Sequence, residues 1–185
     1  MQKAQIRRGR RRFATTWEQR RLGEIADFNP SCDIPDEFEY VDLESVVGTE
    51  MIDHRRERRA TAPSRAQRLA QAGDIFYQTV RPYQKNNYLF ELPDGNFVFS
   101  TGYAQLRTGK SSRFLFRLLQ RDAFVKEVLD RCTGTSYPAI SSADMSVIAV
   151  TLPVNSEEQR QIGALFQKLD SLIALHQRER VEVCL

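Results

Sequence analysis

The segment "LPVNSEEQRQIGALFQKLDSLIALHQRE", Leu152 to Glu179, constrains the fold most, because it joins a helix start to a long apolar stripe. Asn155 or Ser156 is placed to cap a helix. Glu158 or Gln159, three residues on, completes a capping box. The stripe then follows heptad positions a, d and e: Ile162, Leu165, Phe166, Leu169, Leu172, Ile173 and His176.

Two interpretations of this helix are open. It can pack back on its own domain, which is the commoner fate of an apolar-striped helix, or it can pair with another helix. The stripe runs for at least two heptads and follows about 150 residues, a length that can already close a core. The pattern therefore favours helix pairing.

Composition limits the class of protein. The 185 residues are 41% hydrophobic and 28% charged, with a mean hydropathy of -0.48, which predicts one main domain over residues 1–153 and a helix over 154–185. No apolar run approaches the roughly 20 residues of a membrane span, and the start "MQKAQIRRGRRRF" is no secretory signal, so a cytoplasmic location is expected. Three distant cysteines and two histidines suggest neither a disulfide framework nor a metal site.

Positive charge is concentrated in two places. The leader, residues 1–16, holds six Lys and Arg within its first twelve positions and is either a phosphate-binding arm or a solvated tail. The stretch from Asp53 to Arg68 sets six Arg against one Asp and one Glu. This composition predicts a loop, either presented to an anion or simply solvated.

Local patterns predict an α+β fold with a mixed, mostly antiparallel sheet. Helical spacing predicts a short helix from Trp17 to Asn29, and two helices between residues 111 and 134 with a break near Gln120. Short alternating, apolar or aromatic runs predict strands in "EYVDLESVV", "GDIFYQTV", "NYLFEL", "DGNFVFS" and "MSVIAVTLP".

Motifs for catalysis are missing from the sequence. The loop "FNPSC" lacks the second proline and the aromatic ring of an amino-methyltransferase motif, and "PDEFE" and "PDGNF" do not continue as nuclease motifs. Neither phosphate-binding glycine loops nor a nucleophile elbow occurs. We therefore expect no catalysis, no metal and no cofactor in this chain.

Five ordered segments together resemble the DNA-specificity subunits of type I restriction-modification systems. They are "WEQRRLGEIADF", "AGDIFYQTVRPY", "FSTGYAQLR", "GTSYPAIS" and the C-terminal segment quoted above, and they span residues 17–179.

The resemblance implies a target recognition domain over residues 1–153 that reads one half of a split DNA site. The helix over residues 154–185 would act as a spacer that packs against a counterpart and docks modification subunits. Those subunits would bring S-adenosylmethionine and methylate adenine, and a restriction subunit would join the complex. A usual family member has two recognition domains and two helices, so this chain would be a half-subunit, a fragment or a truncated product. A homodimer through the helix would restore two domains.

Within this interpretation, phosphates require Lys or Arg, and base edges require paired donors and acceptors. The phosphate candidates are Arg55, Arg56, Arg58 and Arg59. The base-reading candidates lie in "TVRPYQKNNY", either a groove-facing loop or a polar turn: Arg81, Tyr83, Gln84, Lys85, Asn86 and Asn87. Further backbone contacts are expected from Ser100, Thr101 and Tyr103. Two other classes stay open, a protein-binding adaptor and a small stand-alone DNA-acting enzyme.

Overall fold

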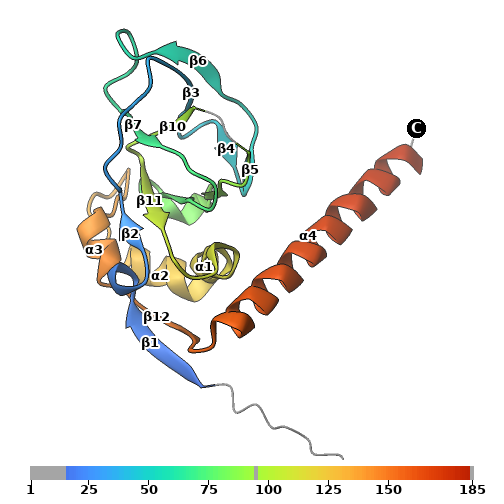
Figure 1. Ribbon diagram of the computed structural model, residues 1–185. Helices are drawn as coiled ribbons and strands as arrows, with labels where there is room; N and C mark the ends of the chain where they lie inside the picture. The colour runs from blue at the N-terminus through green and yellow to red at the C-terminus, as the bar shows by residue number, and fades with distance from the viewer. Residues whose placement is uncertain (1–15, 94–95, 184–185) are drawn as a thin grey trace, which may run out of the picture.

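Two four-stranded sheets form the body of the protein, which a computed structural model describes for residues 16–93 and 96–183 (Figure 1). The sheet that carries β6 lies at one end of the molecule, and helices α1, α2 and α3 lie toward the other end. Every strand pair is antiparallel except β3 with β10. The predicted α+β fold with a mixed, mostly antiparallel sheet is confirmed.

The first sheet has the strand order β6-β3-β10-β7. Its strands are β3 (Glu37–Val41), β6 (Arg55–Arg58), β7 (Ala66–Leu69) and β10 (Phe97–Ser100). The prediction of a loop over the arginine cluster is therefore wrong for its first part. Glu37 and Glu39 of β3 lie opposite Arg58 and Arg56 of β6, and such cross-strand charge pairs favour an ordered edge strand.

The second sheet has the order β2-β11-β8-β9 and is antiparallel throughout. Its strands are β2 (Asp27–Phe28), β8 (Ile75–Gln78), β9 (Tyr88–Leu89) and β11 (Tyr103–Arg107). All four residues of β8 are buried, because both faces of the sheet are covered. Phe76 stacks on Phe99 of the first sheet at a centroid distance of 3.6 Å. Ile75 and Tyr77 instead pack in the core between the second sheet and the helices, here called the helix-side core. A short hairpin, β4 (Val46–Val47) and β5 (Glu50–Met51), adjoins the core between the sheets.

Helices α1 (Ser112–Leu119), α2 (Asp122–Leu129) and α3 (Ser142–Ser146) cover the second sheet. Ser111 caps α1 by accepting a hydrogen bond from the Phe114 amide at 3.3 Å. Ser141 caps α3 in the same way. The predicted break near Gln120 is confirmed, since Gln120 forms the C-cap of α1.

The predicted helix from Trp17 to Asn29 is wrong. Trp17–Arg21 forms β1, which pairs with β12 (Ala149–Pro153), and only Leu22–Glu24 makes a helical turn, of the 3-10 type. The helical spacing of Leu22, Ile25 and Ala26 reflects this single turn, which buries the three side chains in the helix-side core. One turn is too short to be told from a helix by spacing alone.

Helix α4 (Ser156–Val183) starts beside α1 and β12 and extends away from the body (Figure 1). The Asn155 side chain accepts a hydrogen bond from the Glu157 amide at 2.8 Å, so Asn155 provides the predicted cap. The leader, apart from Thr16, and the first two residues of the predicted strand segment "DGNFVFS", Asp94 and Gly95, lie outside the described residues.

Candidate nucleic-acid interface

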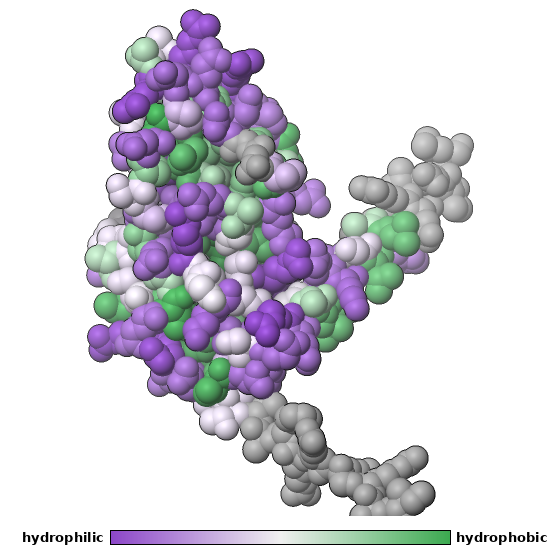
Figure 2. Space-filling model, in the orientation of Figure 1, coloured by the Kyte–Doolittle hydropathy of each residue, from purple (hydrophilic) through white to green (hydrophobic). Residues whose placement is uncertain are grey.

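The edge strand β6 presents basic side chains at the end of the molecule where Figure 2 shows mostly hydrophilic surface. Arg56 Nη2 lies 2.5 Å from Glu37 Oε2, and Arg58 Nε lies 3.3 Å from Glu37 Oε1. The two arginine side chains are 73% and 77% exposed. The hydrogen bond from Arg56 lowers the pKa of Glu37. One carboxylate, Glu37, thus serves the two exposed guanidinium groups of Arg56 and Arg58.

The other two predicted phosphate ligands are placed differently. Arg55 contacts two acids, with Nη1 at 2.7 Å from Asp42 Oδ2 and Nε at 2.9 Å from Glu57 Oε1. Arg59 donates from Nη1 to the carbonyl oxygen of Ile34 at 3.1 Å. A carbonyl leaves the charge of Arg59 uncompensated, so Arg56, Arg58 and Arg59 are better phosphate candidates than Arg55.

The turn between β8 and β9 holds most of the predicted base-reading residues. Its centre is the 3-10 turn Pro82–Gln84, flanked by Arg81 and Lys85, which have φ values of 54° and 56°. Lys85 forms an ion pair with Asp122 of α2. The guanidinium carbon of Arg81 lies 4.1 Å from the ring centroid of Tyr137, a cation–π distance. These contacts hold the turn against two distant parts of the chain.

The two asparagines of the turn have largely structural contacts. Asn87 is 1% exposed. Its Oδ1 accepts a hydrogen bond from the main-chain N–H of Gln78 at 2.8 Å, and its Nδ2 donates to Gln120 Oε1 at 2.9 Å. Asn86 is partly exposed and accepts from the Gly48 amide at 2.9 Å. For Asn87 the polar-turn alternative therefore describes the structure, whereas Asn86 keeps its amide nitrogen for a further partner.

A groove of about 360 Å³ opens beside this turn. Its lining residues are Leu43, Glu44, Val46, Val47, Arg65, Gln78, Val80, Arg81, Gln84, Asn86 and Tyr137. Tyr83, at the tip of the same turn, is 51% exposed. Sequence reasoning placed Arg65 only within the arginine-rich stretch and missed Gln78 and Tyr137, because the three residues come from separate segments. An antiparallel bridge between Val80 and Ala139 brings the Tyr137 loop to the turn.

The three further residues predicted to contact the DNA backbone do not form part of this groove. Ser100 and Tyr103 are 2% and 1% exposed. The Ser100 hydroxyl accepts from the Gly102 amide at 3.3 Å, and the Tyr103 hydroxyl donates to the carbonyl of Asp42 at 3.2 Å. Thr101 is partly exposed. Burial therefore argues against a DNA contact by Ser100 or Tyr103.

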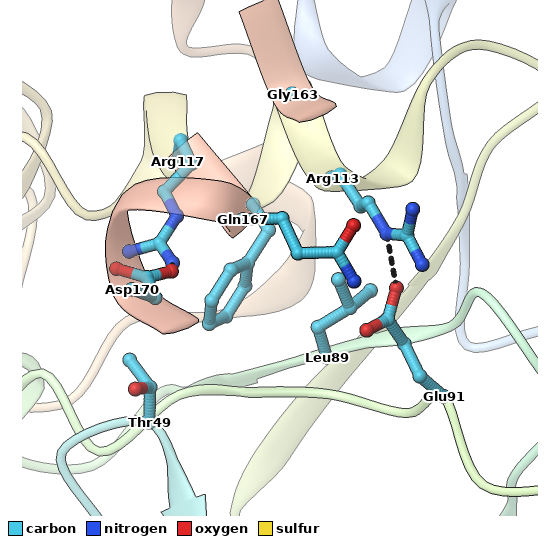
Figure 3. Close-up of a pocket in the computed structure, with 9 residues that line it drawn as sticks. Thr49, Leu89, Glu91, Arg113, Arg117, Gly163, Gln167 and Asp170 are labelled. Carbon is cyan, nitrogen blue, oxygen red and sulfur yellow. Dashed lines mark hydrogen bonds and ion pairs between the residues drawn. The ribbon is translucent and has the colours of Figure 1, made fainter. Parts of the chain in front are cut away.

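The first turns of α4 are seated on α1. Gly163 lies so close to α1 that a Cβ atom there would be 3.0 Å from the Phe114 amide nitrogen. Ile162 packs against the helix-side core. Figure 3 shows Arg117 of α1 facing Asp170 of α4, with which it forms an ion pair. The self-packing alternative thus holds for the start of α4.

Farther along α4 the apolar stripe is exposed. Figure 2 shows hydrophobic surface along this helix, away from the body. The exposed fractions are 57% for Leu165, 41% for Phe166, 43% for Leu169, 61% for Leu172 and 55% for Ile173. His176 also lies on the exposed part. Only the first residues of the stripe therefore pack on the chain's own domain.

Metal-binding and membrane-spanning features are both missing from residues 16–93 and 96–183. This part of the chain holds no cluster of three metal-ligating side chains. Within the same residues, no helix combines the length and apolar character needed to cross a bilayer.

Comparison with known proteins identifies the family. The model of the type I restriction modification DNA specificity domain matches residues 14–184. No curated protein matches the chain significantly.

Solved structures agree with this match. The HsdS subunit from Thermoanaerobacter tengcongensis is 31% identical, with a TM-score of 0.72 over 90% of this chain and 45% of that chain. A chain from a study of complex assembly and conformational transition of the type I R-M system is 30% identical, with a TM-score of 0.71 and the same two coverages. The type I S subunit from M. genitalium is 14% identical with a TM-score of 0.58, covers 86% and 40%, and supports the fold alone.

The chain spans 45% of the length of each of the first two solved chains. Since the family model covers residues 14–184, the chain belongs to the type I restriction-modification DNA specificity domain family.

Proposed function

We propose that this chain reads one half of a split DNA site for a type I restriction-modification complex. The observation that carries the proposal is the groove beside the turn at residues 81–87, where amide and guanidinium groups line a concave surface. Such groups match the donors and acceptors on base edges in the major groove. The chain's 45% coverage of longer relatives suits a single recognition unit.

Phosphate and base contacts would come from different parts of the protein. Arg56 and Arg58 of β6, and Arg59 directly after it, are exposed and incompletely neutralised, which suits phosphate oxygens. Gln84 and Asn86 line the groove and suit base edges. Phosphate contacts would fix the register of the duplex, and the amides would supply sequence preference.

Helix α4 would position the catalytic partners. The stripe from Leu165 to Ile173 would pair with a second helix, either in another copy of this chain or in a partner subunit, and set the spacing between recognition units. In this arrangement residues 1–153 form the recognition domain and residues 154–185 the spacer. Methyltransferase subunits would bind S-adenosylmethionine and modify adenine, and a restriction subunit would cleave. This chain itself would carry neither the cofactor nor the chemistry.

Selection from random duplexes tests the proposal, using the complete chain assembled with the methyltransferase subunits of its own system. We expect enrichment of a fixed short sequence and retardation of that duplex in a gel. An adaptor would bind the methyltransferase and leave the selection unchanged. A stand-alone enzyme would methylate or cleave DNA without any partner.

A further inference from the structure

Gln78 is a buried glutamine whose amide has only one favourable orientation. It is 2% exposed, and its Nε2 donates to the carbonyl oxygen of Val80 at 2.6 Å and to Gln84 Oε1 at 2.8 Å. A main-chain carbonyl can only accept, so a reversed amide would set two acceptors against each other. Its Oε1 has no hydrogen-bond partner, although the residue lines the groove.

The orientation of the Gln78 side-chain amide determines the orientation of the Gln84 side-chain amide. Because Gln78 presents a donor, Gln84 must present Oε1 to it, and Gln84 Nε2 then points elsewhere. That nitrogen has no acceptor among the described residues, and Oε1 has a second lone pair free. The exposed Gln84 thus offers a donor and an acceptor in a fixed order.

We propose that Gln78 is a positioning residue that holds Gln84 for bidentate recognition of an adenine in the major groove. This inference rests on the proposed DNA-reading function. Adenine presents N7 as an acceptor and N6 as a donor, which match Gln84 Nε2 and Oε1. Guanine presents two acceptors, so one of them would face Gln84 Oε1.

The backbone around Gln84 supports a fixed role. Arg81 and Lys85, on either side of the 3-10 turn, adopt left-handed conformations. Such strained positions cluster where binding requires one geometry. The ring of Tyr137 under Arg81 and the ion pair of Lys85 with Asp122 keep both residues in place.

Gln105 is a matched comparison within the same protein. It is 0% exposed, its Nε2 donates to the carbonyl of Leu69 at 2.9 Å and to Asp74 Oδ2 at 2.7 Å, and its Oε1 is also unpartnered. Its partners are core groups, and it does not line the groove. Gln105→Met therefore controls for the loss of a buried amide without a change at the base.

The test compares duplex selection by the parent chain, Gln78→Met and Gln105→Met, each assembled with the methyltransferase subunits. Methionine keeps the length of glutamine and removes the hydrogen bonds. We expect the parent and Gln105→Met to require adenine at one shared position, and Gln78→Met to accept all four bases there with an unchanged salt dependence. In the parent, purine without N6 or 7-deazaadenine at that position should weaken binding roughly tenfold to a hundredfold.

The outcomes separate this inference from the proposed function. A parent that selects no sequence would overturn both. A parent that selects a sequence while Gln78→Met keeps the full preference, or loses it at a base other than adenine, would overturn the positioning role alone. If Gln78→Met does not fold, the exposed variant Gln84→Met replaces it. Gln84→Met must then abolish the effect of both base analogues for the inference to stand.

Discussion

At the level of single residues, an ion pair with a buried carboxylate joins Asp74, the residue before β8, to Arg107 of the neighbouring strand β11 in the second sheet. The Asp74 side chain is 0% exposed, and Arg107 contacts it twice, Nε to Oδ1 and Nη2 to Oδ2, both at 2.8 Å. The hydrogen bond to Asp74 raises the pKa of Arg107. Arg107→Met would leave a buried carboxylate without its counter-charge, so we expect a loss of about 3–5 kcal/mol in the free energy of unfolding, measured in urea.

An exposed arginine provides the control for that prediction. Arg131 lies 2.7 Å from Glu127 in an i,i+4 pair with side chains 38% and 55% exposed. Arg131→Met should change the free energy of unfolding by no more than about 0.5 kcal/mol, because water solvates the remaining carboxylate of Glu127. Equal losses in the two variants would show that burial is not what makes the Asp74 pair important.

Arg56 and Arg58 give a prediction about DNA rather than stability. They share one carboxylate and are mostly exposed, so replacing both with Ala should weaken binding to all duplexes alike. The slope of log K against log salt should fall by about 0.9 for each phosphate that the variant no longer neutralises. Arg131→Ala serves as the control on another surface, and an unchanged slope in the double variant would remove β6 from the interface.

Composition identified the turn at residues 81–87 but could not sort its residues. Gln84 and Asn87 are both amides, yet Gln84 is exposed and Asn87 is 1% exposed with both amide groups used. The sequence did not predict a role for Gln78, because it lies on a buried strand, where only the hydrogen-bond partners of a polar residue indicate its function. Exposure and hydrogen-bond direction are properties of the fold, and a polar sequence motif carries neither.

At the scale of elements, the contact between α1 and α4 depends on Gly163. In a free helix Gly→Ala stabilises by about 1 kcal/mol. Here the new Cβ would meet the Phe114 amide nitrogen at 3.0 Å and Arg113 Cβ at 3.1 Å. We therefore expect the sign to reverse, with Gly163→Ala lowering the melting temperature and Gly163→Val lowering it more.

The open loop position Gly109 is the control, since nothing lies within 4 Å of a Cβ there. Gly109→Ala should leave the melting temperature nearly unchanged. A rise in melting temperature for Gly163→Ala would mean that α4 is not seated on α1 in solution.

Elements with long, regular patterns were predicted well from the sequence. The helices α1, α2 and α4 have regular apolar spacing, and α1 and α4 also have side-chain caps that act locally. The edge strand β6 and the strand β1 were missed, because their residues are largely exposed and their conformation depends on distant partners, β3 and β12. Pairing across such sequence distances leaves no local signal.

At the scale of the whole molecule, we propose that the exposed stripe of α4 sets the assembly. A closed symmetric dimer is the simplest way for one chain to bury a self-complementary patch, and it would present two identical recognition domains. The DNA site would then be an inverted repeat with a gap. A partner subunit with its own apolar helix would bury the same stripe without that symmetry.

Leu165→Ala combined with Leu172→Ala tests this role, because the two side chains are 57% and 61% exposed in the single chain. If they are buried in a helix pair, each should cost on the order of 2–5 kcal/mol of pairing energy. Sedimentation should then show a monomer that no longer recruits the methyltransferase, while the melting temperature of the recognition domain stays near that of the parent. Leu172→Ala alone should show part of this loss.

Ile162→Ala is the matched control on the same helix, because Ile162 packs against the helix-side core. This variant should lower the melting temperature. If the Leu165 and Leu172 double variant behaves like Ile162→Ala, the stripe packs on its own domain in solution and the spacer role fails. If the parent stays monomeric at high concentration yet loses the methyltransferase in the double variant, the stripe pairs with the partner subunit, because only a contact between different chains explains that combination.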